Sequence, residues 1–393
     1  MKADTPGPGC HGATIDPGPG APGLPAVVLF SQTEWGLAWV FAHDLARHFA
    51  EKGHRVVFLD PFPKRFPRLG EWRRLLGRLL GRTRLAGFAD HPRPPGARFL
   101  TPLTLPDSSR LFTWVNRCFL LPGLQRRVLD ACGGARRFVF IFQPFRTPAT
   151  LAARLCPERL VYARRDSYGD DPGLKRLRIL EAELLAAADL VVAAGPVLAG
   201  RSREFAAKVL DIPGLVDFAA FFRPAAAAPG ADPLCCYLGH VNERVDLPLL
   251  RRVAKRYRLR VIGRISVAWP DGGNEERLGM VPHDRVPELL AATDVVVIPY
   301  RLEGFSGSIF PYKLFQAFAQ GKPVVATRLP ALAPLAHLVY LAASADEFLV
   351  QIARAAAEGP AIKLERQALA RQHDRETVLE SLRLRLLVET GVR

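Results

Sequence analysis

The chain has 393 residues, of which 49% are hydrophobic and 23% are charged, and its formal net charge is +16. This composition excludes a largely disordered protein, and the length exceeds one ordinary core, so two or three domains are expected. Most of the positive excess lies in residues 1–232. A positive field favours nucleic acid, anionic lipid or a diphosphate substrate as partner, although an arginine-rich proteome would give the same excess.

The cysteines and the apolar runs bear on the cellular compartment. None of the six cysteines forms a CxxC pair, and the adjacent Cys235 and Cys236 would face opposite sides of a strand, which is poor geometry for a shared metal. We interpret all six as buried thiols of a cytosolic protein. The first 24 residues lack the apolar region of a signal peptide, and no run approaches the ~18 apolar residues of a membrane span. We therefore expect a cytoplasmic protein, free or lying on a membrane surface.

The first half of the chain alternates short apolar strands with amphipathic helices. After a Gly- and Pro-rich tail at 1–24, which we expect to be disordered, a buried strand is followed by apolar residues at every fourth position from Leu37 to Phe49, which predict a helix ended by Gly53. Pro, Ala and Gly at 223–233 indicate a linker. The elements expected before it are strands at 26–30, 55–60, 137–142, 159–164 and 190–195, and a helix at 174–188.

A second alternating set follows the linker. Its expected elements are strands at 234–239, 258–263, 295–299 and 323–327, and helices at 246–257, 284–292 and 309–320. Such alternation implies parallel sheets covered on both faces. The predicted fold class is therefore α/β, with an N-terminal Rossmann-like domain at 25–222, a second at 234–361 and a helical segment at 362–393 long enough to return to the first domain. Ligands of such sheets bind beyond the carboxyl ends of the strands, here in a cleft between the domains.

The most informative stretch for function is 294–327, DVVVIPYRLEGFSGSIFPYKLFQAFAQGKPVVAT. A buried strand delivers Tyr300 to the cleft, where it could stack on a base, and a loop containing Gly and Ser leads into a helix expected to begin near Ile309. Helix N-termini attract phosphates. Lys313, one turn into that helix, adds a positive charge, and Gln316 shares its face. The stretch predicts a diphosphate site.

This stretch also resembles the donor-nucleotide segment of GT-B glycosyltransferases: a strand ending in Pro-Tyr, a variable loop, then P-x-K-L-F-Q-x-x-x-x-G-K-P-V-V. The segment YLGHVNERVDLPLL resembles the strand and glycine turn that open the nucleotide domain, and ADLVVAAGPVLA, IPGLVDFAAFF and VYARRDSYGDDP resemble first-domain segments. The resemblance spans about 26–330 and is stronger in the second domain. It is closest to the membrane-associated glucuronosyltransferase of xanthan synthesis (the GumK type) and to teichuronic-acid-type relatives.

The resemblance implies roles for three residues. In the GumK type, a lysine and a glutamine three residues later contact the diphosphate and the ribose, and a tyrosine after the strand lies near the nucleotide. Carried over, these are Lys313, Gln316 and Tyr300. A solvated helix lysine is the alternative interpretation of Lys313.

The glycine turn after the first strand of the second domain adds further donor-side candidates. Gly239 would let the backbone approach the phosphates closely, or it serves only a tight turn. His240 and Asn242 follow it and could contact phosphate or sugar. No metal is expected, because Asp170 and Asp171 are adjacent and precede a proline, as in a turn, and GT-B enzymes neutralise the leaving diphosphate with side chains and a helix dipole. No cofactor is expected besides the nucleotide sugar, which is the donor substrate.

The stereochemistry of transfer is inferred from a missing pattern. Many retaining relatives carry Glu-x7-Glu here, but the matching positions are Ser308 and Gln316. Both remain donor-side candidates, and the absence of the glutamates favours inversion. An inverting mechanism needs one general base near the acceptor hydroxyl, which the resemblance places at Asp166, after a first-domain strand. A surface ion pair with Arg164 or Arg165 is the alternative interpretation of Asp166.

A second catalytic candidate and a membrane segment complete the prediction. His43, on the helix after the first strand, could assist the acceptor, or it is a structural histidine. Residues 61–84 combine a Trp/Leu face with many Lys and Arg against a single acidic residue, Glu71. This pattern is typical of a helix lying in an anionic membrane interface; packing of the Leu stripe on the first sheet is the alternative. Sparse aromatic interleaving and the lack of a known binding module argue against nucleic acid.

Together these patterns predict a glycosyltransferase that takes a sugar from a nucleotide diphosphate. The expected donor is a UDP-sugar, with Arg301 available to pair with the carboxylate of UDP-glucuronate. The expected acceptor is a glycan or a polyprenyl-diphosphate-linked saccharide of cell-surface polysaccharide synthesis, reached from the inner face of the membrane. Two rivals stay open: a nucleotide-sugar 2-epimerase of the same fold, and a non-catalytic protein that binds anionic lipid or RNA.

Overall fold

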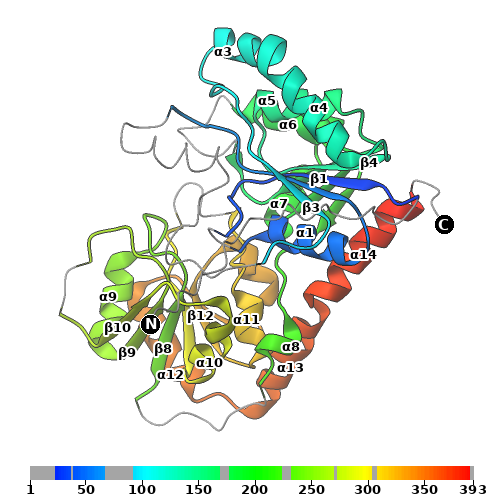
Figure 1. The fold of residues 1–393 in the computed structure, drawn as a ribbon. Helices are drawn as coiled ribbons and strands as arrows, with labels where there is room; N and C mark the ends of the chain where they lie inside the picture. Colours follow the sequence, from blue (N-terminus) through cyan, green and yellow to red (C-terminus); the bar gives the residue numbers. More distant parts are fainter. Residues whose placement is uncertain are drawn as a thin grey trace, which may run out of the picture.

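A computed structural model describes residues 23–36, 39–66, 92–168, 177–223, 232–269, 272–302 and 308–389. It forms two lobes, each built on a parallel sheet (Figure 1). The predicted α/β class with two Rossmann-like domains is confirmed. The expected tail at 1–24 lies outside the described residues except for its last two positions, and most of the expected linker and of the 61–84 segment also lies outside them.

The first sheet has the strand order β3-β2-β1-β4-β5-β6-β7, with every pairing parallel. Its strands are β1 (Ala26–Phe30), β2 (Val56–Leu59), β3 (Ala97–Leu100), β4 (Arg137–Ile141), β5 (Arg159–Arg164), β6 (Leu190–Ala193) and β7 (Val209–Asp211). The order reverses between β1 and β4, so this sheet has the topological switch point of a doubly wound fold, where ligands bind beyond the strand ends.

The helices of the first domain cover both faces of this sheet. They are α1 (Phe41–Glu51), α3 (Arg110–Val115), a π-helical turn (Asn116–Leu120), α4 (Leu121–Cys132), α5 (Arg146–Arg154), α6 (Leu177–Ala187), α7 (Pro196–Ser202) and α8 (Phe218–Phe221). Alternate residues of the central strands enter two separate cores, one under α1 and one under α4. This two-sided burial explains why the strands are continuous apolar runs.

The second sheet repeats the plan with the order β10-β9-β8-β11-β12-β13, again all parallel. Its strands are β8 (Leu234–Leu238), β9 (Arg258–Ile262), β10 (Glu275–Gly279), β11 (Val295–Ile298), β12 (Val324–Thr327) and β13 (Val339–Ala342). Its helices are α9 (Leu247–Arg256), a 3-10 turn (His283–Arg285) running into α10 (Val286–Ala291), α11 (Leu314–Ala319), a 3-10 segment (Pro330–Leu335) and α12 (Ala345–Ala356). The switch point lies between β8 and β11.

The C-terminal segment connects the lobes. It forms two helices, α13 (Pro360–Gln372) and α14 (Arg375–Val388), instead of one continuous stretch, because the Asp374 side chain caps α14 and also accepts a hydrogen bond from the Phe218 backbone N–H at 3.1 Å. In Figure 1 the two helices run along one side of the molecule from the lower lobe to the upper. There α14 packs its leucines into the core beneath α1, and Lys52 pairs with Glu376 at 2.7 Å.

Two local expectations are wrong. The helix expected at 309–320 begins only at Leu314, because Pro311 disfavours a helical conformation at the preceding Phe310. The cysteines are not all buried: Cys118 and Cys156 are exposed, Cys118 on the π-helical turn and Cys156 in a turn with a positive φ of 45°. Cys132, Cys235 and Cys236 are buried, as expected. No helix among the described residues is long and apolar enough to cross a membrane.

Candidate functional site

The donor side of the candidate site is built where β8 and β11 end, on either side of the switch point of the second sheet. Gly239 follows β8 directly, and Tyr300 follows β11 by two residues. Lys313 stands at the N-cap of α11. The fold therefore brings together three of the predicted donor residues that lie up to 74 positions apart in the chain.

Lys313 lies against the backbone of Gly239. A Cβ atom at Gly239 would lie 1.6 Å from the Lys313 Nζ, and the φ of +144° at this glycine is one that other residues rarely adopt. The next strand end approaches equally closely, because a Cβ at Gly263 would lie 2.2 Å from the Gly239 carbonyl oxygen. The φ of Gly239 disfavours any other residue, and close approach of its backbone to a phosphate remains a prediction.

Within the described residues, the Lys313 ammonium has no nearby carboxylate. Burial lowers its pKa to about 8, and the thiol of Cys236 opposes this shift only in part. Its Nζ lies 5.9 Å from the centroid of the Tyr237 ring. No carboxylate in the described part of the chain forms an ion pair with it. A partly desolvated cation in this state favours an anionic ligand, which would restore the pKa of the lysine.

Tyr300 is held firmly. Burial raises its pKa, and its hydroxyl shares a hydrogen bond with Tyr237, whose own hydroxyl donates to the His240 carbonyl at 3.1 Å. The Tyr300 carbonyl accepts from the Thr327 hydroxyl at 2.7 Å. Tyr300 also lines a cavity of about 510 Å³ together with Arg301 and the ends of β12 and β13. This volume is within the range of small-molecule sites; stacking on a base remains a prediction.

The other donor-side candidates differ in their surroundings. His240 is exposed, and its Nε2 lies 2.8 Å from the Ser266 hydroxyl. The Asn242 side-chain oxygen accepts the Arg244 backbone N–H at 3.1 Å, so this residue shapes the turn after β8. Ser308 is buried. Gln316 is 9% exposed on α11, and its amide makes no hydrogen bond to another described residue.

Asp166 follows β5 at the carboxyl end of the first sheet. Burial raises the pKa of its carboxyl group, and three cations oppose this shift: Arg244, Arg165 and Lys64. Arg244 belongs to the second domain, so the charges around Asp166 come from both lobes. Arg164 pairs with Glu181 at 3.0 Å, whereas Arg165 donates to the Ile212 carbonyl at 2.9 Å and also acts on Asp166, so the general-base and the ion-pair interpretations of Asp166 both remain predictions.

Sequence reasoning missed Arg244 and Lys64. Arg244 stands in the turn after β8 and acts on the pKa values of both Asp166 and Tyr300. Lys64 stands beyond the end of β2, and burial lowers its pKa. Both residues follow parallel strands, and the carboxyl ends of such strands meet at one edge of a sheet. This position is the sequence signal that could have identified them as site residues.

His43 does not line the cleft. It is fully buried on α1, with its ring 4.8 Å from that of Trp35, 5.4 Å from that of Trp39 and 5.4 Å from that of Phe58. An acceptor cannot reach the ring in this conformation, so the structure favours the structural interpretation.

The residues just before Lys313 join the two domains. The Tyr312 hydroxyl donates to the Asp44 carboxylate of α1 at 2.8 Å, and the Trp39 indole N–H donates to the same carboxylate at 2.7 Å. Asp44 is 3% exposed, and burial raises its pKa. Phe310 lies on Gly195, where a Cβ would come within 2.8 Å of the phenylalanine side chain. The loop bearing Lys313 is thus fastened to the first domain.

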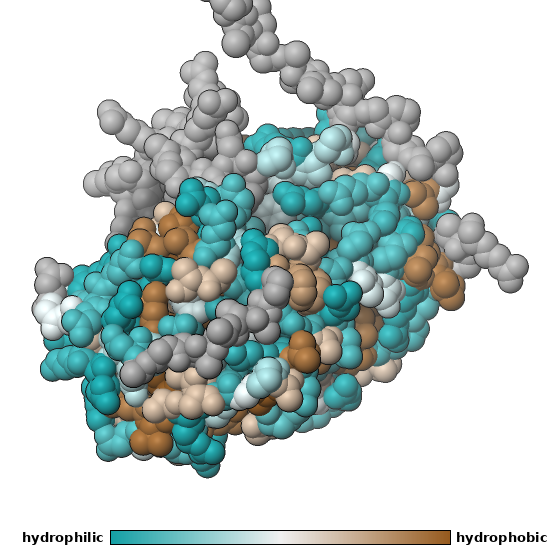
Figure 2. Space-filling model, turned by 90° about the horizontal axis from the view of Figure 1, so that it is seen from below, coloured by the Kyte–Doolittle hydropathy of each residue, from teal (hydrophilic) through white to brown (hydrophobic). Residues whose placement is uncertain are grey.

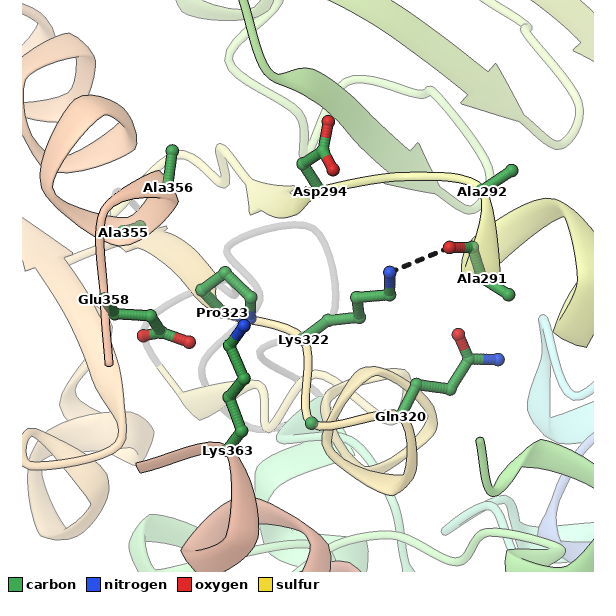
Figure 3. Close-up of a pocket in the computed structure, with 11 residues that line it drawn as sticks. Ala291, Ala292, Asp294, Gln320, Lys322, Pro323, Ala355, Ala356, Glu358 and Lys363 are labelled. Carbon is green, nitrogen blue, oxygen red and sulfur yellow. Dashed lines mark hydrogen bonds between the residues drawn. The ribbon is translucent and has the colours of Figure 1, made fainter. Parts of the chain in front are cut away.

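A separate cavity lies away from this cleft, at the amino end of β12 (Figure 3). Lys322, Lys363, Asp294 and Glu358 line it, and the Lys322 Nζ donates to the Ala291 carbonyl at 2.8 Å. The lysine charge is therefore already engaged by backbone carbonyls, and we assign no ligand to this cavity. A group of three or more potential metal ligands does not occur among the described residues.

The two lobes with their parallel sheets define a two-domain α/β protein of the GT-B fold. Residues 243–358, within the second domain, match the model of the family "Glycosyl transferases group 1". The "Putative teichuronic acid biosynthesis glycosyltransferase TuaH" of Bacillus subtilis (strain 168) is 42% identical over 45 residues, 12% of this chain. That match spans about a tenth of the relative, 11% of its length.

Solved structures agree with the fold over nearly the whole chain. A glycosyltransferase from Rickettsia africae has a TM-score of 0.62 at 12% identity, covering 93% of this chain and 98% of its own. "Trehalose-6-phosphate from E. coli bound with UDP-2-fluoro glucose" has a TM-score of 0.60 at 11% identity, covering 92% and 98%. WaaG, a glycosyltransferase involved in lipopolysaccharide biosynthesis, has a TM-score of 0.56 at 12% identity, covering 92% and 98%. At these identities the likeness concerns the fold alone.

Proposed function

We propose that this protein is a glycosyltransferase that transfers a sugar from a nucleotide diphosphate, with UDP as the expected nucleotide, to an acceptor hydroxyl. The single observation that carries the proposal is the half-buried Lys313 side chain, whose ammonium lies against Gly239 at the switch point with no carboxylate partner among the described residues. The group 1 match begins at residue 243, after Gly239, and it includes Arg244 and this lysine. A pyrophosphate supplies the negative charge that the lysine lacks.

The proposed chemistry is a single displacement in the cleft. Asp166 takes the proton of the acceptor hydroxyl, the hydroxyl oxygen bonds to the anomeric carbon, and the bond from that carbon to the diphosphate breaks. The electron pair leaves with the diphosphate, where Lys313 and Arg244 stabilise the new charge. Gln316 is proposed to hold the ribose, and Tyr300 to lie by the base. Helix α11 begins at Leu314, so its N-terminus lies at Lys313 instead of near Ile309.

The finer assignments rest on the sequence resemblance. UDP-glucuronate as donor would use Arg301, which lines the cavity next to Tyr300. A lipid-linked acceptor and residence on the inner face of the membrane fit the basic first half of the chain and the segment 61–84. The relative TuaH is described as acting in teichuronic acid biosynthesis, which agrees with a cell-surface polysaccharide as product.

A thermal-shift experiment with nucleotides tests the proposal. UDP at a hundred times its Kd would stabilise the protein by about 2.7 kcal/mol. The Lys313→Ala variant should lose most of this shift and most turnover, whereas Lys255→Ala, an exposed lysine of α9, should keep both. An unchanged UDP shift in Lys313→Ala would refute the phosphate role. Turnover of the nucleotide sugar without any acceptor would favour the epimerase, and no response to any nucleotide would favour a non-catalytic protein.

A further inference from the structure

The outer end of the first domain carries an exposed apolar surface, which we call the α3 surface. It lies at the tip of the upper lobe, on the side away from the second domain (Figure 1). Leu111 is 62% exposed, Trp114 54% and Phe119 65%. Phe66 and Leu103, both about half exposed, complete it. Three of the five lie within nine residues of one another, whereas other exposed large apolar residues, such as Val350 and Leu364, stand singly on separate helices.

Local geometry gathers these side chains. The rings of Trp114 and Phe119 lie 5.6 Å apart, although residues five apart in an α-helix point in different directions. The π-helical turn Asn116–Leu120 accounts for the contact, because its wider turn brings the fifth residue round to the same side. The rings of Phe66 and Phe112 form a second pair, 5.4 Å apart.

The inner side of the same turn is anchored to the domain. Asn116 is fully buried, and its side chain bonds to the backbone of Leu105 at 2.8 Å in both directions and to the Thr147 hydroxyl at 3.0 Å. This anchor holds the turn in place, so the aromatic residues are presented outward by a fixed scaffold. Large apolar groups gathered on a fixed scaffold and left in water mark a contact surface for a partner.

The charges around the α3 surface decide what kind of partner fits. Arg110 and Arg117 are exposed among its apolar residues, and no described carboxylate pairs with either. The nearest acidic residue in the chain, Asp107, is engaged by the backbone N–H and hydroxyl of Thr147. Tryptophan and phenylalanine beside unpaired arginines suit an interface between acyl chains and anionic headgroups. Lone apolar residues mixed with polar ones, as on the face in Figure 2, do not form such a pattern.

A cavity lies beside the α3 surface. Its walls include Phe62, Leu105 and Phe145, with the cations Lys64 and Arg146 among them. Two stretches of the chain, 62–66 and 103–105, contribute residues both to the wall of this cavity and to the α3 surface. Lys64, in the wall of this cavity, also acts on the pKa of Asp166.

We propose that the α3 surface docks the protein on an anionic lipid bilayer, with Trp114 and Phe119 entering the interface and Arg110 and Arg117 contacting the headgroups. This docking holds the mouth of the adjacent cavity at the membrane, where a lipid-linked acceptor would be found. The inference rests on the proposed function only for that acceptor; the docking itself does not require it. Apart from Phe66, the residues of this surface lie outside the segment 61–84 that the sequence predicted as the membrane contact.

Vesicle co-sedimentation of the full chain tests the docking. The probe is phosphatidylcholine vesicles with and without 30% phosphatidylglycerol, roughly the anionic content at which basic surfaces bind. The double variant Trp114→Ser/Phe119→Ser should need at least about tenfold more lipid for half-binding. Val350→Ser/Leu364→Ser removes two equally exposed apolar residues elsewhere and should bind like the unmodified protein. Arg110→Gln/Arg117→Gln should weaken binding only to the anionic vesicles.

A fluorescence experiment tests whether the Trp114 side chain itself enters the bilayer. Trp114→Phe keeps the apolar character, so it should still bind vesicles but lose part of the quenching by brominated lipid. The UDP-induced thermal shift serves as a separate readout and should be unchanged in all these variants, so loss of docking and loss of the proposed donor site are told apart. Equal lipid dependence of the serine variant and the unmodified protein would overturn the proposal. So would a variant that changes self-association in solution while vesicle binding stays the same.

Discussion

The hydrogen bond between Tyr312 and Asp44 gives the sharpest test of how the two domains cooperate. Tyr312→Phe removes one hydroxyl and leaves the ring in place. In the structure this hydroxyl donates to Asp44 at 2.8 Å across the domain boundary, one residue before Lys313. Asp44 then retains Trp39 at 2.7 Å and a longer contact with Arg375 at 3.8 Å.

The magnitude follows from the burial of the acceptor. Asp44 is 3% exposed, so water cannot replace the lost donor without rearrangement. A hydrogen bond to a charged group contributes about 1.5–3 kcal/mol. A loss of about 2 kcal/mol lowers Tm by roughly 4–8 °C in a domain of about 200 residues. Because the lost bond fastens the loop that carries Lys313, we also expect donor affinity to fall about tenfold, equivalent to about 1.4 kcal/mol.

A matched variant separates the two effects. The Tyr340 hydroxyl donates to the Glu358 carboxylate at 3.2 Å, within the second domain and away from the cleft. Tyr340→Phe should lower Tm without changing the Kd for UDP, whereas Tyr312→Phe should change both. Scanning calorimetry gives Tm, and isothermal titration gives the Kd. Identical UDP affinities in Tyr312→Phe and the unmodified protein would show that the interdomain bond does not position the donor loop.

The remaining predictions concern the charges and the close contact of the site. UDP affinity should fall as pH rises through about 8, because Lys313 loses its proton there, and Lys313→Ala should abolish this step in a titration series. Stability moves the opposite way: the folded pKa lies below the ordinary 10.5, so the free energy of unfolding of the unliganded protein should rise between about pH 8 and 10.5 in denaturant melts. Gly239→Ala should abolish UDP binding, since a Cβ there would lie 1.6 Å from the lysine nitrogen, while Gly200→Ala, with no atom within 4 Å, should bind normally. Asp166→Asn should lower kcat by about 10²–10⁴-fold and leave UDP binding intact; a retained kcat would remove it as the base.

Local sequence signals predicted most of the central strands. The runs at 26–30 and 234–238 are apolar throughout, and the run at 159–164 is apolar between its terminal arginines, because both faces of each sheet are covered. The edge strands β3 and β10 were missed, since they contain charged residues and are partly exposed. Helix α11 begins late because of Pro311. This proline is visible in the sequence, but the helical spacing of the apolar residues around it predicted an earlier start.

The sequence by itself determined the two alternating sets of strands and helices, and it marked Gly239, Tyr300 and Lys313 as one donor-side group, because each follows or faces the end of a parallel strand. Only the tertiary structure decided which groups from distant segments share one environment. It buried His43 among aromatic rings, set Arg244 of the second domain near Asp166 of the first, and joined Tyr312 to Asp44. These outcomes depend on how one lobe packs on the other, and no periodicity within a single helix or strand encodes that packing.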